Sequence, residues 1–319
     1  MCIRDSPYAV NRYYRTPDAQ TWNLTVQHEL PHNFFAEIGY LGTKGTDLDV
    51  QLLPNEGPSS FGRSHQIGNA VGFTFDNSVG DSIYHALQLR VNRRFSGGIS
   101  MQAFYTFSKS IDDSSSFGGA GNTVAQNWLD LAAERGLSSF NRPQVLTFNW
   151  IYTSPFGTPT SRIAADSKGG RLLRDWQLSG GLTAESGTPL TARVLGNTAV
   201  LAQTGGIGSG RAEATGESIE SATGFFNLAA FTIPPEGEFG NAGRNTIPGP
   251  DLIALNATFG RSFQFGESRR RLELRLEANN VLNTVSLTNV YTVVNATNYG
   301  LPSAASAMRS LTAVMRFRF

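Results

Sequence analysis

The last nine residues, LTAVMRFRF (311–319), alternate strictly between two kinds of position. Successive side chains of an extended chain point to opposite sides, so alternate residues share a face. One face is apolar and holds Leu311, Ala313, Met315, Phe317 and Phe319, whereas the other holds Arg316 and Arg318. The same period of two recurs upstream within residues 22–26, 34–40, 87–91, 99–107, 146–152, 176–182, 253–260 and 272–279. This periodicity predicts nine β-strands and little helix.

The connections between these nine segments alternate in length. LPHN (30–33), SGG (96–98) and residues 266–270 are tight, 155–173 is intermediate, and long loops lie near 43–82, 111–142, 187–250 and 282–306. Strands of about ten residues, with short turns on one side and long loops on the other, are typical of barrels that cross a bilayer. We therefore predict an all-β fold, a portion of an antiparallel transmembrane β-barrel with extracellular long loops and periplasmic short turns.

The composition agrees with a membrane barrel and argues against several other classes. Charged residues make up 16% of the chain, below the roughly 25% of soluble domains, and no run of about 18 apolar residues could form a transmembrane helix. A net charge of +1 gives no electrostatic reason to expect nucleic acid, and the single Cys2 can form no internal disulfide. A soluble β-sandwich binding module is an alternative fold, and it would dissolve without detergent.

The predicted lipid-facing positions carry few charges, and these avoid the middle of the strands. Arg93, Arg261 and His28 lie near short-turn ends, and Arg309 lies at the start of the last strand. An arginine facing lipid costs about 2–4 kcal/mol at the midplane and much less at the interfaces. Aromatic residues at similar levels predict two girdles. The girdle residues are Phe34, Phe95, Tyr152, Trp176, Phe263 and Phe319 at the periplasmic rim, and Tyr40, Tyr105 and Phe107 toward the outer rim.

The other face of the same strands carries charged residues suited to a wet barrel interior. We predict that these residues pair with one another across neighbouring strands. They are Glu37, Arg90, Arg94, Glu273, Arg275, Glu277, Arg316 and Arg318.

Two short motifs resemble parts of enzyme sites but have simpler explanations. GDSIYH (80–85) is similar to the nucleophile block of some esterases, yet none of the four histidines has an aspartate three residues before it. We expect a loop that enters a strand. GGIGSG (205–210) fits no phosphate-binding pattern and is expected to be a flexible loop.

Two charged segments suggest ligands. Asp112 and Asp113 could hold calcium, but two carboxylates are a thin ligand set, and a turn is the simpler interpretation. The basic segment 261–271 could pass for a nucleic-acid patch, but it fits a strand hairpin better. We assign no catalytic residue, metal or cofactor.

Five stretches carry a resemblance to a known family. They are YHALQLRVNRRFSGGISMQAFYTFSKSIDD (84–113), FNRPQVLTFNWIYTSPFG (140–157), DWQLSGGLTAESGTPL (175–190), FGNAGRNTIPGPDLIALNATFGRSF (239–263) and LRLEANNVLNT (274–284). Together they resemble the C-terminal barrel of TonB-dependent outer-membrane receptors, most closely the Oar-like subgroup with a carboxypeptidase-regulatory-like domain. The resemblance implies a barrel of about 22 strands or more with an N-terminal plug and a TonB box. This chain would supply the last nine or ten strands and neither plug nor box.

The resemblance also implies a domain organisation. Residues 1–6 (MCIRDS) look like non-native sequence, and 7–319 would be the C-terminal part of the barrel domain. Nine or ten strands leave two open edges, so we expect an open, curved sheet. In such barrels the last strand is similar to a signal for the outer-membrane assembly machinery, here Leu311, Ala313, Met315, Phe317 and Phe319.

The implied function is ligand import across the outer membrane of a Gram-negative bacterium. The whole receptor would bind a scarce small ligand outside and import it with energy from the TonB complex, reached through the missing N-terminal part. The barrel itself would contact outer-membrane lipid. Loop 187–250, with Phe225, Phe226 and Phe231, is the expected ligand loop. A passive pore, or a surface adhesin or secretion barrel without energy coupling, is the alternative.

Overall fold

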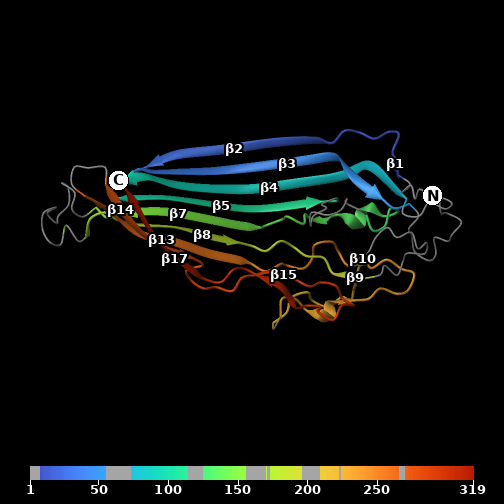
Figure 1. Ribbon diagram of the computed structural model, residues 1–319. Helices are drawn as coiled ribbons and strands as arrows, with labels where there is room; N and C mark the ends of the chain where they lie inside the picture. Colours follow the sequence, from blue (N-terminus) through green and yellow to red (C-terminus); the bar gives the residue numbers. More distant parts are fainter. Residues whose placement is uncertain are drawn as a thin grey trace, which may run out of the picture.

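The computed structural model describes residues 8–54, 73–113, 125–155, 170, 173–195, 209–222, 224–265 and 270–319. Nine long strands form one antiparallel sheet in which each strand pairs with the next one along the chain (Figure 1). They are β2 (Asp18–Leu30), β3 (Phe34–Leu52), β4 (Thr74–Ser96), β5 (Ile99–Asp112), β7 (Gln144–Thr153), β8 (Trp176–Glu185), β13 (Leu252–Gln264), β14 (Arg271–Asn279) and β17 (Ser310–Arg318). Two short strands, β1 (Tyr8–Val10) and β6 (Gly136–Leu137), pair with β4 and β5. The prediction of nine long strands is confirmed.

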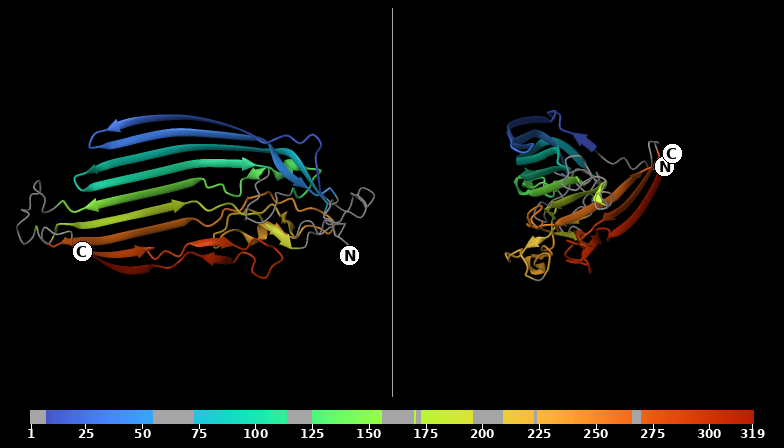
Figure 2. Two further views of the ribbon diagram at one scale, coloured as in Figure 1. Left: turned by 45° about the horizontal axis from the view of Figure 1, so that its top comes forward. Right: turned by 90° about the vertical axis from the view of Figure 1, so that its left-hand side faces the viewer.

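The sheet does not close on itself. Its path runs from β17 at one edge to β2 at the other, and the strands viewed end-on follow an arc (Figure 2, right). The predicted open, curved sheet is thus confirmed. The described residues include two short 3-10 helices, η3 (Leu131–Glu134) and η4 (Leu228–Ala230), and helical residues at 170 and 173, but no helix long and apolar enough to cross a membrane.

The cross-strand register gives the sheet a barrel-like stagger. The row of partners that begins at the Leu30–Phe34 pair, next to the first short turn, ends eight strand steps away at Leu311. Strand β17 continues for seven residues beyond that row, to Arg318 at its short-turn end. Seven residues of about 3.4 Å over eight steps of about 4.8 Å correspond to a tilt of roughly 32°. Strands of membrane barrels tilt by about 35–45°.

Strands β3 and β4 are longer than the sequence pattern predicted. β3 continues to Leu52 and β4 begins at Thr74, so much of the segment expected as loop 43–82 is strand, and the GDSIYH motif lies within β4. Outside a bilayer, paired strands need no apolar face, because their backbones still form hydrogen bonds with each other. The alternation of apolar and polar side chains therefore stops while the pairing of the strands continues. The far end of β3 buries Val50 and Leu52 against Ala125.

The long connections fold into a compact unit at the end opposite the short turns (Figure 1). We define this cap as the described parts of 187–250 together with 282–306. Three small two-stranded sheets build it, β9 with β10, β11 with β12, and β15 with β16. Their bounds are β9 (Arg193–Leu195), β10 (Ser209–Arg211), β11 (Glu213–Ala214), β12 (Phe231–Thr232), β15 (Leu287–Val290) and β16 (Pro302–Ala305).

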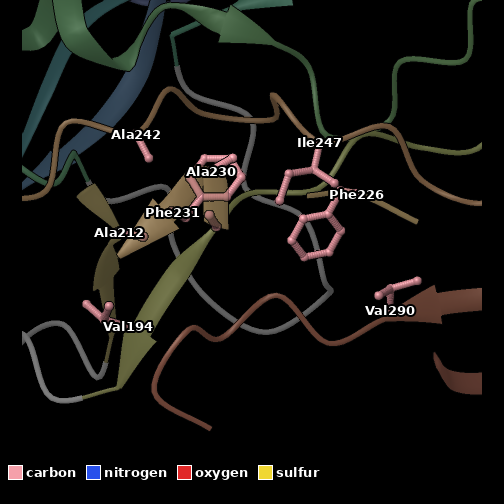
Figure 3. Packing of buried hydrophobic residues seen from close by; sticks show 9 residues of the cluster. Val194, Ala212, Phe226, Ala230, Phe231, Ala242, Ile247 and Val290 are labelled. Carbon is pink, nitrogen blue, oxygen red and sulfur yellow. The ribbon is translucent and has the colours of Figure 1, made fainter. Parts of the chain in front are cut away.

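The largest buried apolar cluster lies in the cap rather than along the long strands (Figure 3). Its members are Ala192, Val194, Ala212, Phe226, Ala230, Phe231, Ala242, Ile247 and Val290. On the long strands large apolar side chains stay exposed, for example Leu24 at 69% and Met315 at 75%. A single sheet layer with this much exposed apolar surface requires a second apolar phase beside it.

Candidate functional site: membrane face, polar face and cap

Apolar side chains of neighbouring strands lie in register on one face of the sheet. A typical row of cross-strand partners contains Val26, Ile38, Leu89, Tyr105, Leu146, Ala184 and Ile253. A row of the opposite parity contains Asn92, Gln102, Asn149, Gly181 and Asn256. The sheet therefore has one continuous apolar face and one polar face, as a wall between lipid and water requires.

The aromatic residues predicted as girdles fall at two levels of the apolar face once the tilt is taken into account, whereas Phe148, Trp150 and Phe259 lie between these levels on the same face. Depth is measured along each strand from the line that joins Leu30, next to the first short turn, to Arg318 at the short-turn end of β17. The residues of the first group lie within about three residues of that line. This group is Phe34, Phe95, Tyr152, Trp176, Phe263 and Phe319. Tyr40, Tyr105 and Phe107 lie about seven residues further up, which is roughly 21 Å along the membrane normal. The apolar band of membrane barrels is about 25 Å tall, so this spacing would suit two girdles.

The polar face is hollowed along its length. One hollow of about 510 Å³ is lined by Gln102, Asn149, Ser179, Asn256 and Glu277, among others. A second, of about 310 Å³, lies nearer the short-turn end and includes Gln177, Ser262 and Glu273. Both hollows carry hydrogen-bonding groups that would hold water or polar solutes, although Met101, Trp150 and Ile151 also line the first.

The charged side chains of the polar face pair partly between strands, since Arg94 of β4 lies 3.8 Å from Glu29 of β2, and partly within one strand. Arg275 Nε lies 2.9 Å from Glu273 and Nη1 lies 3.6 Å from Glu277, both on its own strand β14. Residues two apart on a strand share a face, and the long arginine side chain reaches both carboxylates without crossing to a neighbour. Contact across strands occurs between Gln27 and Glu37, at 2.8 Å.

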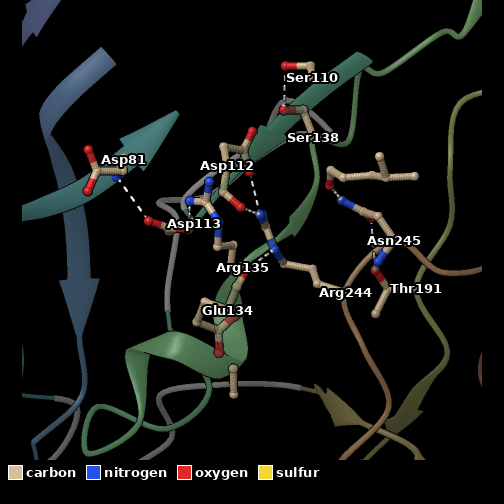
Figure 4. A network of polar contacts seen from close by, with 12 residues as sticks. Asp81, Ser110, Asp112, Asp113, Glu134, Arg135, Ser138, Thr191, Arg244 and Asn245 are labelled. Atoms are coloured by element: carbon tan, nitrogen blue, oxygen red, sulfur yellow. Dashed lines mark hydrogen bonds and ion pairs between the residues drawn. The ribbon is translucent and has the colours of Figure 1, made fainter. Parts of the chain in front are cut away.

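Two buried ion pairs tie the cap to the end of strand β5 and to η3, and Figure 4 shows the first of them, between Arg244 and Asp112. Arg244 contacts the Asp112 carboxylate, with side chains only 12% and 5% exposed, and its Nε donates to the Glu134 carbonyl at 2.8 Å. Arg211 lies 3.2 Å from the Glu134 carboxylate, and this pair is 10% and 7% exposed. Buried charges that are both paired and hydrogen-bonded fix the relative position of the segments that carry them.

The same network includes Asp112 and Asp113, for which the sequence left a turn and a calcium site as alternatives. Asp112 is taken by Arg244, and Asp113 pairs with Arg135 at 3.1 Å. Both carboxylates therefore have an arginine partner, Asp112 as the last residue of β5 and Asp113 in a bend directly after it, while 114–124 lie outside the described residues. Among the described residues, no group of three or more His, Cys, Asp or Glu side chains could hold a metal ion.

Neutral hydrogen bonds extend this junction. Asn245 donates through Nδ2 to the Leu137 carbonyl at 2.5 Å and accepts through Oδ1 from the Thr191 hydroxyl at 2.9 Å. The hydroxyls of Ser110 and Ser138 lie 2.7 Å apart. Segments separated by more than a hundred residues thus meet at one polar junction (Figure 4).

The sequence matches the family described as "Outer membrane beta barrel domain" over residues 3–312. The chain belongs to this family. It is accordingly a protein of the outer membrane, and its apolar face is the face that such a barrel turns toward lipid. No curated protein is similar enough in sequence to count as a match.

Solved structures of similar fold include two outer-membrane proteins. The outer membrane transporter YddB from Escherichia coli is similar with a TM-score of 0.53 and 12% sequence identity. The similar region covers 98% of this chain and 34% of the YddB chain. The pyoverdine outer membrane receptor FpvA from Pseudomonas aeruginosa PAO1, bound to pyoverdine, is similar with a TM-score of 0.50 and 12% sequence identity. The similar region covers 99% of this chain and 31% of the FpvA chain. This outer-membrane barrel chain therefore spans about a third of the length of these two proteins, of which the first is described as a transporter and the second as a receptor.

The three phenylalanines expected to contact a ligand occupy different environments in this outer-membrane barrel. Phe226 is 3% exposed and Phe231 is 5% exposed, and both pack in the cap core (Figure 3). Phe226 also meets Tyr299 edge-on at 5.5 Å. Phe225 is 40% exposed, so it is the one of the three whose side chain a ligand could reach.

The cap also exposes apolar residues that sequence reasoning missed. Leu228, Tyr291 and Leu301 are all exposed on it. They lie close together, because Tyr299 donates its hydroxyl to the Leu228 carbonyl at 3.3 Å and the Tyr291 amide bonds to Leu301. Burial raises the pKa of Tyr299 to about 12. No local pattern marks these residues, because their proximity comes from the β15–β16 pairing.

The remaining predicted segments have these outcomes. Part of GGIGSG is strand rather than flexible loop, since Ser209 and Gly210 belong to β10, while 205–208 lies outside the described residues. The basic segment 261–271 joins the paired strands β13 and β14, so the predicted hairpin is confirmed. Residues 1–7 also lie outside the described residues. Phe319 follows the edge strand β17 and is almost fully exposed.

Proposed function

We propose that this chain is the C-terminal barrel portion of a TonB-dependent, Oar-like receptor. The complete protein would bind a scarce small ligand at the cell surface and import it with energy transmitted by TonB. The observation that carries the proposal is the cap, a folded unit with its own apolar core that buried arginine pairs hold at the loop end of the strands. Loops held on a rigid scaffold are where binding residues concentrate.

The proposed orientation follows from the asymmetry of the two sheet ends. The short turns would face the periplasm, and the cap would face the outside. The predicted girdle residues would then sit at the two lipid interfaces, about 21 Å apart. The final strand would be recognised by the assembly machinery through its alternating apolar residues and the terminal Phe319.

The cap offers surface of the kind that a ligand site needs. Phe225, Leu228 and Leu301 give exposed apolar area next to polar backbone groups, and ligand sites combine apolar walls with a few hydrogen-bonding groups. The polar face below the cap carries hollows lined by amide and hydroxyl side chains. A ligand released from the cap would pass along this face.

Energy coupling would reside in the part of the complete protein that precedes this chain. The chain covers about a third of the outer-membrane transporter and of the pyoverdine receptor that share its fold. A plug and a TonB box upstream would suit import, whereas a barrel without them would be a passive pore, an adhesin or a secretion barrel.

The test uses the full-length protein in liposomes and a soluble periplasmic domain of TonB. We expect the protein to bind the TonB domain and to let no small sugar through in a liposome-swelling assay. Sugar permeation together with no TonB binding would overturn the proposal in favour of the passive pore. Absence of both activities would favour an adhesin.

A further inference from the structure

Two arginines interrupt the lipid-facing side of the sheet near the short-turn ends. Arg93 of β4 stands opposite Phe34, and Arg261 of β13 stands opposite Trp176 and Leu274. Directly opposite residues of paired strands share a face, so both arginines lie on the apolar face. Charged groups are tolerated there only near an interface, where they meet polar partners.

Aromatic rings hold both guanidinium groups. Cζ of Arg93 lies 5.6 Å from the ring centre of Phe34. Cζ of Arg261 lies 5.4 Å from the ring centre of Trp176 and 4.7 Å from that of Phe263. The cation is attracted to the ring face, and such stacking leaves the N–H groups at the guanidinium edge able to donate. Nε of Arg93 is buried and has no hydrogen-bond partner among the described residues.

The two arginines lie at the same depth. The row of partners through Arg93 reaches β13 at Ala257, four strand steps away, and Arg261 lies four residues closer to the short turn. Four residues of about 3.4 Å against four steps of about 4.8 Å give an angle of roughly 35°. This angle agrees with the roughly 32° tilt of the whole sheet, so a line joining the arginines runs parallel to the membrane plane.

Each arginine has exposed apolar side chains on the side toward the bilayer centre. Val91 lies two residues inward of Arg93, and Phe259 lies two residues inward of Arg261. Both are exposed on the apolar face. Trp176 stacks on Phe259 at 4.6 Å and nearly parallel, which extends the apolar wall beside Arg261. A donor fork above an apolar wall matches the order of phosphate and acyl chain in a phospholipid.

We propose that Arg93 and Arg261 each bind the phosphate of one glycerophospholipid in the leaflet at the short-turn end. The guanidinium donates two parallel hydrogen bonds to phosphate oxygens, the ring fixes its plane, and an acyl chain lies along Val91 or Phe259. The two sites are roughly 24 Å apart along the sheet, so they hold two separate lipids. That this leaflet is the periplasmic one rests on the orientation proposed above, but the sites themselves do not.

The test is a lipid titration of the full-length protein in detergent. Phosphatidylglycerol is added, and native mass spectrometry counts the molecules that remain bound. We expect two tightly held lipids on the wild type. Arg93→Gln and Arg261→Gln should each weaken retention of one lipid by roughly tenfold, the effect of losing a charged hydrogen-bond donor.

A matched control removes two arginines from the polar face at the same end. Arg316→Gln/Arg318→Gln should retain both lipids, because these side chains point away from the bilayer. If this control loses as many lipids as Arg93→Gln/Arg261→Gln, or if the latter retains both, the proposal is wrong. Inorganic phosphate at equal concentration should displace neither lipid, and displacement would show a general anion site instead.

A charge-preserving pair covers the case in which the glutamine variants fail to assemble. Arg93→Lys/Arg261→Lys keeps two interfacial cations but removes the planar fork, so retention should fall to an intermediate level. Retention equal to that of the wild type would overturn the bidentate geometry. The titration requires neither TonB nor the imported ligand, so its failure is distinguishable from failure of the proposed function.

Discussion

Replacing Arg244 by methionine tests whether buried ion pairs hold the cap in place. Arg244 contacts the Asp112 carboxylate and donates to the Glu134 carbonyl, and the Asp112 side chain is only 5% exposed. Losing one partner of a buried pair costs about 3–5 kcal/mol, and a carbonyl that loses its donor adds about 1–3 kcal/mol. The sum, about 4–8 kcal/mol, is an upper bound, because the cap can open locally rather than keep an unneutralised charge buried.

Amide hydrogen exchange of the full-length protein measures this opening. The amides of Ala212 and Ala242 bond to the carbonyls of Ala192 and Ala212 inside the cap, so they exchange only when it opens. A loss of about 4 kcal/mol corresponds to roughly thousandfold faster exchange of these amides. Amides of β7 and β8, which lie in the long-strand sheet, should keep their rates.

The double variant Asp112→Leu/Arg244→Met supplies the control. It removes both charges at once, so it should restore much of the protection that Arg244→Met loses. Unchanged exchange at Ala212 and Ala242 in Arg244→Met would refute the reasoning. A double variant that exchanges faster than the single one would do the same, because it would show that packing rather than charge holds the cap.

Three further predictions concern the faces and the cap. Leu276→Arg should destabilise the folded barrel in urea titrations from bilayers by about 2–4 kcal/mol, whereas Thr258→Arg, at similar depth on the polar face, should change it by under about 1 kcal/mol; equal losses would contradict the face assignment. The pKa of Tyr299 is raised from 10.0 to about 12, so its contribution to cap stability is complete below pH 10 and is lost as pH rises toward 12. Tyr299→Phe should abolish that alkaline loss in exchange measurements, and an identical pH profile would show that another group causes it. In intact cells an impermeant maleimide should label Leu301→Cys on the cap but not Pro31→Cys in a short turn, and the reverse labelling would invert the proposed orientation.

The structure of the expected ligand loop was predictable only in outline. The sequence singled out segment 187–250 as the expected ligand loop, but its local pattern does not show that Phe226 and Phe231 face inward while Phe225 faces out. The cap has its own core, and the direction of each side chain there depends on which distant strands pair. The same holds for Asp112, whose arginine partner lies 132 residues away in the chain. Contacts over such separations leave no local pattern.

The sequence by itself determined the nine strands, their two faces and the alternation of short and long connections. These are local properties. A period of two places every second side chain on one face, and a lipid face favours apolar residues away from its interfaces, so the alternation is present in the sequence of each strand. Only the tertiary structure decided where β3 and β4 end, how the long loops fold, and which rings lie over Arg93 and Arg261. Outside the bilayer no apolar period is required, and stagger between strands, rather than position in the chain, sets which residues share a depth.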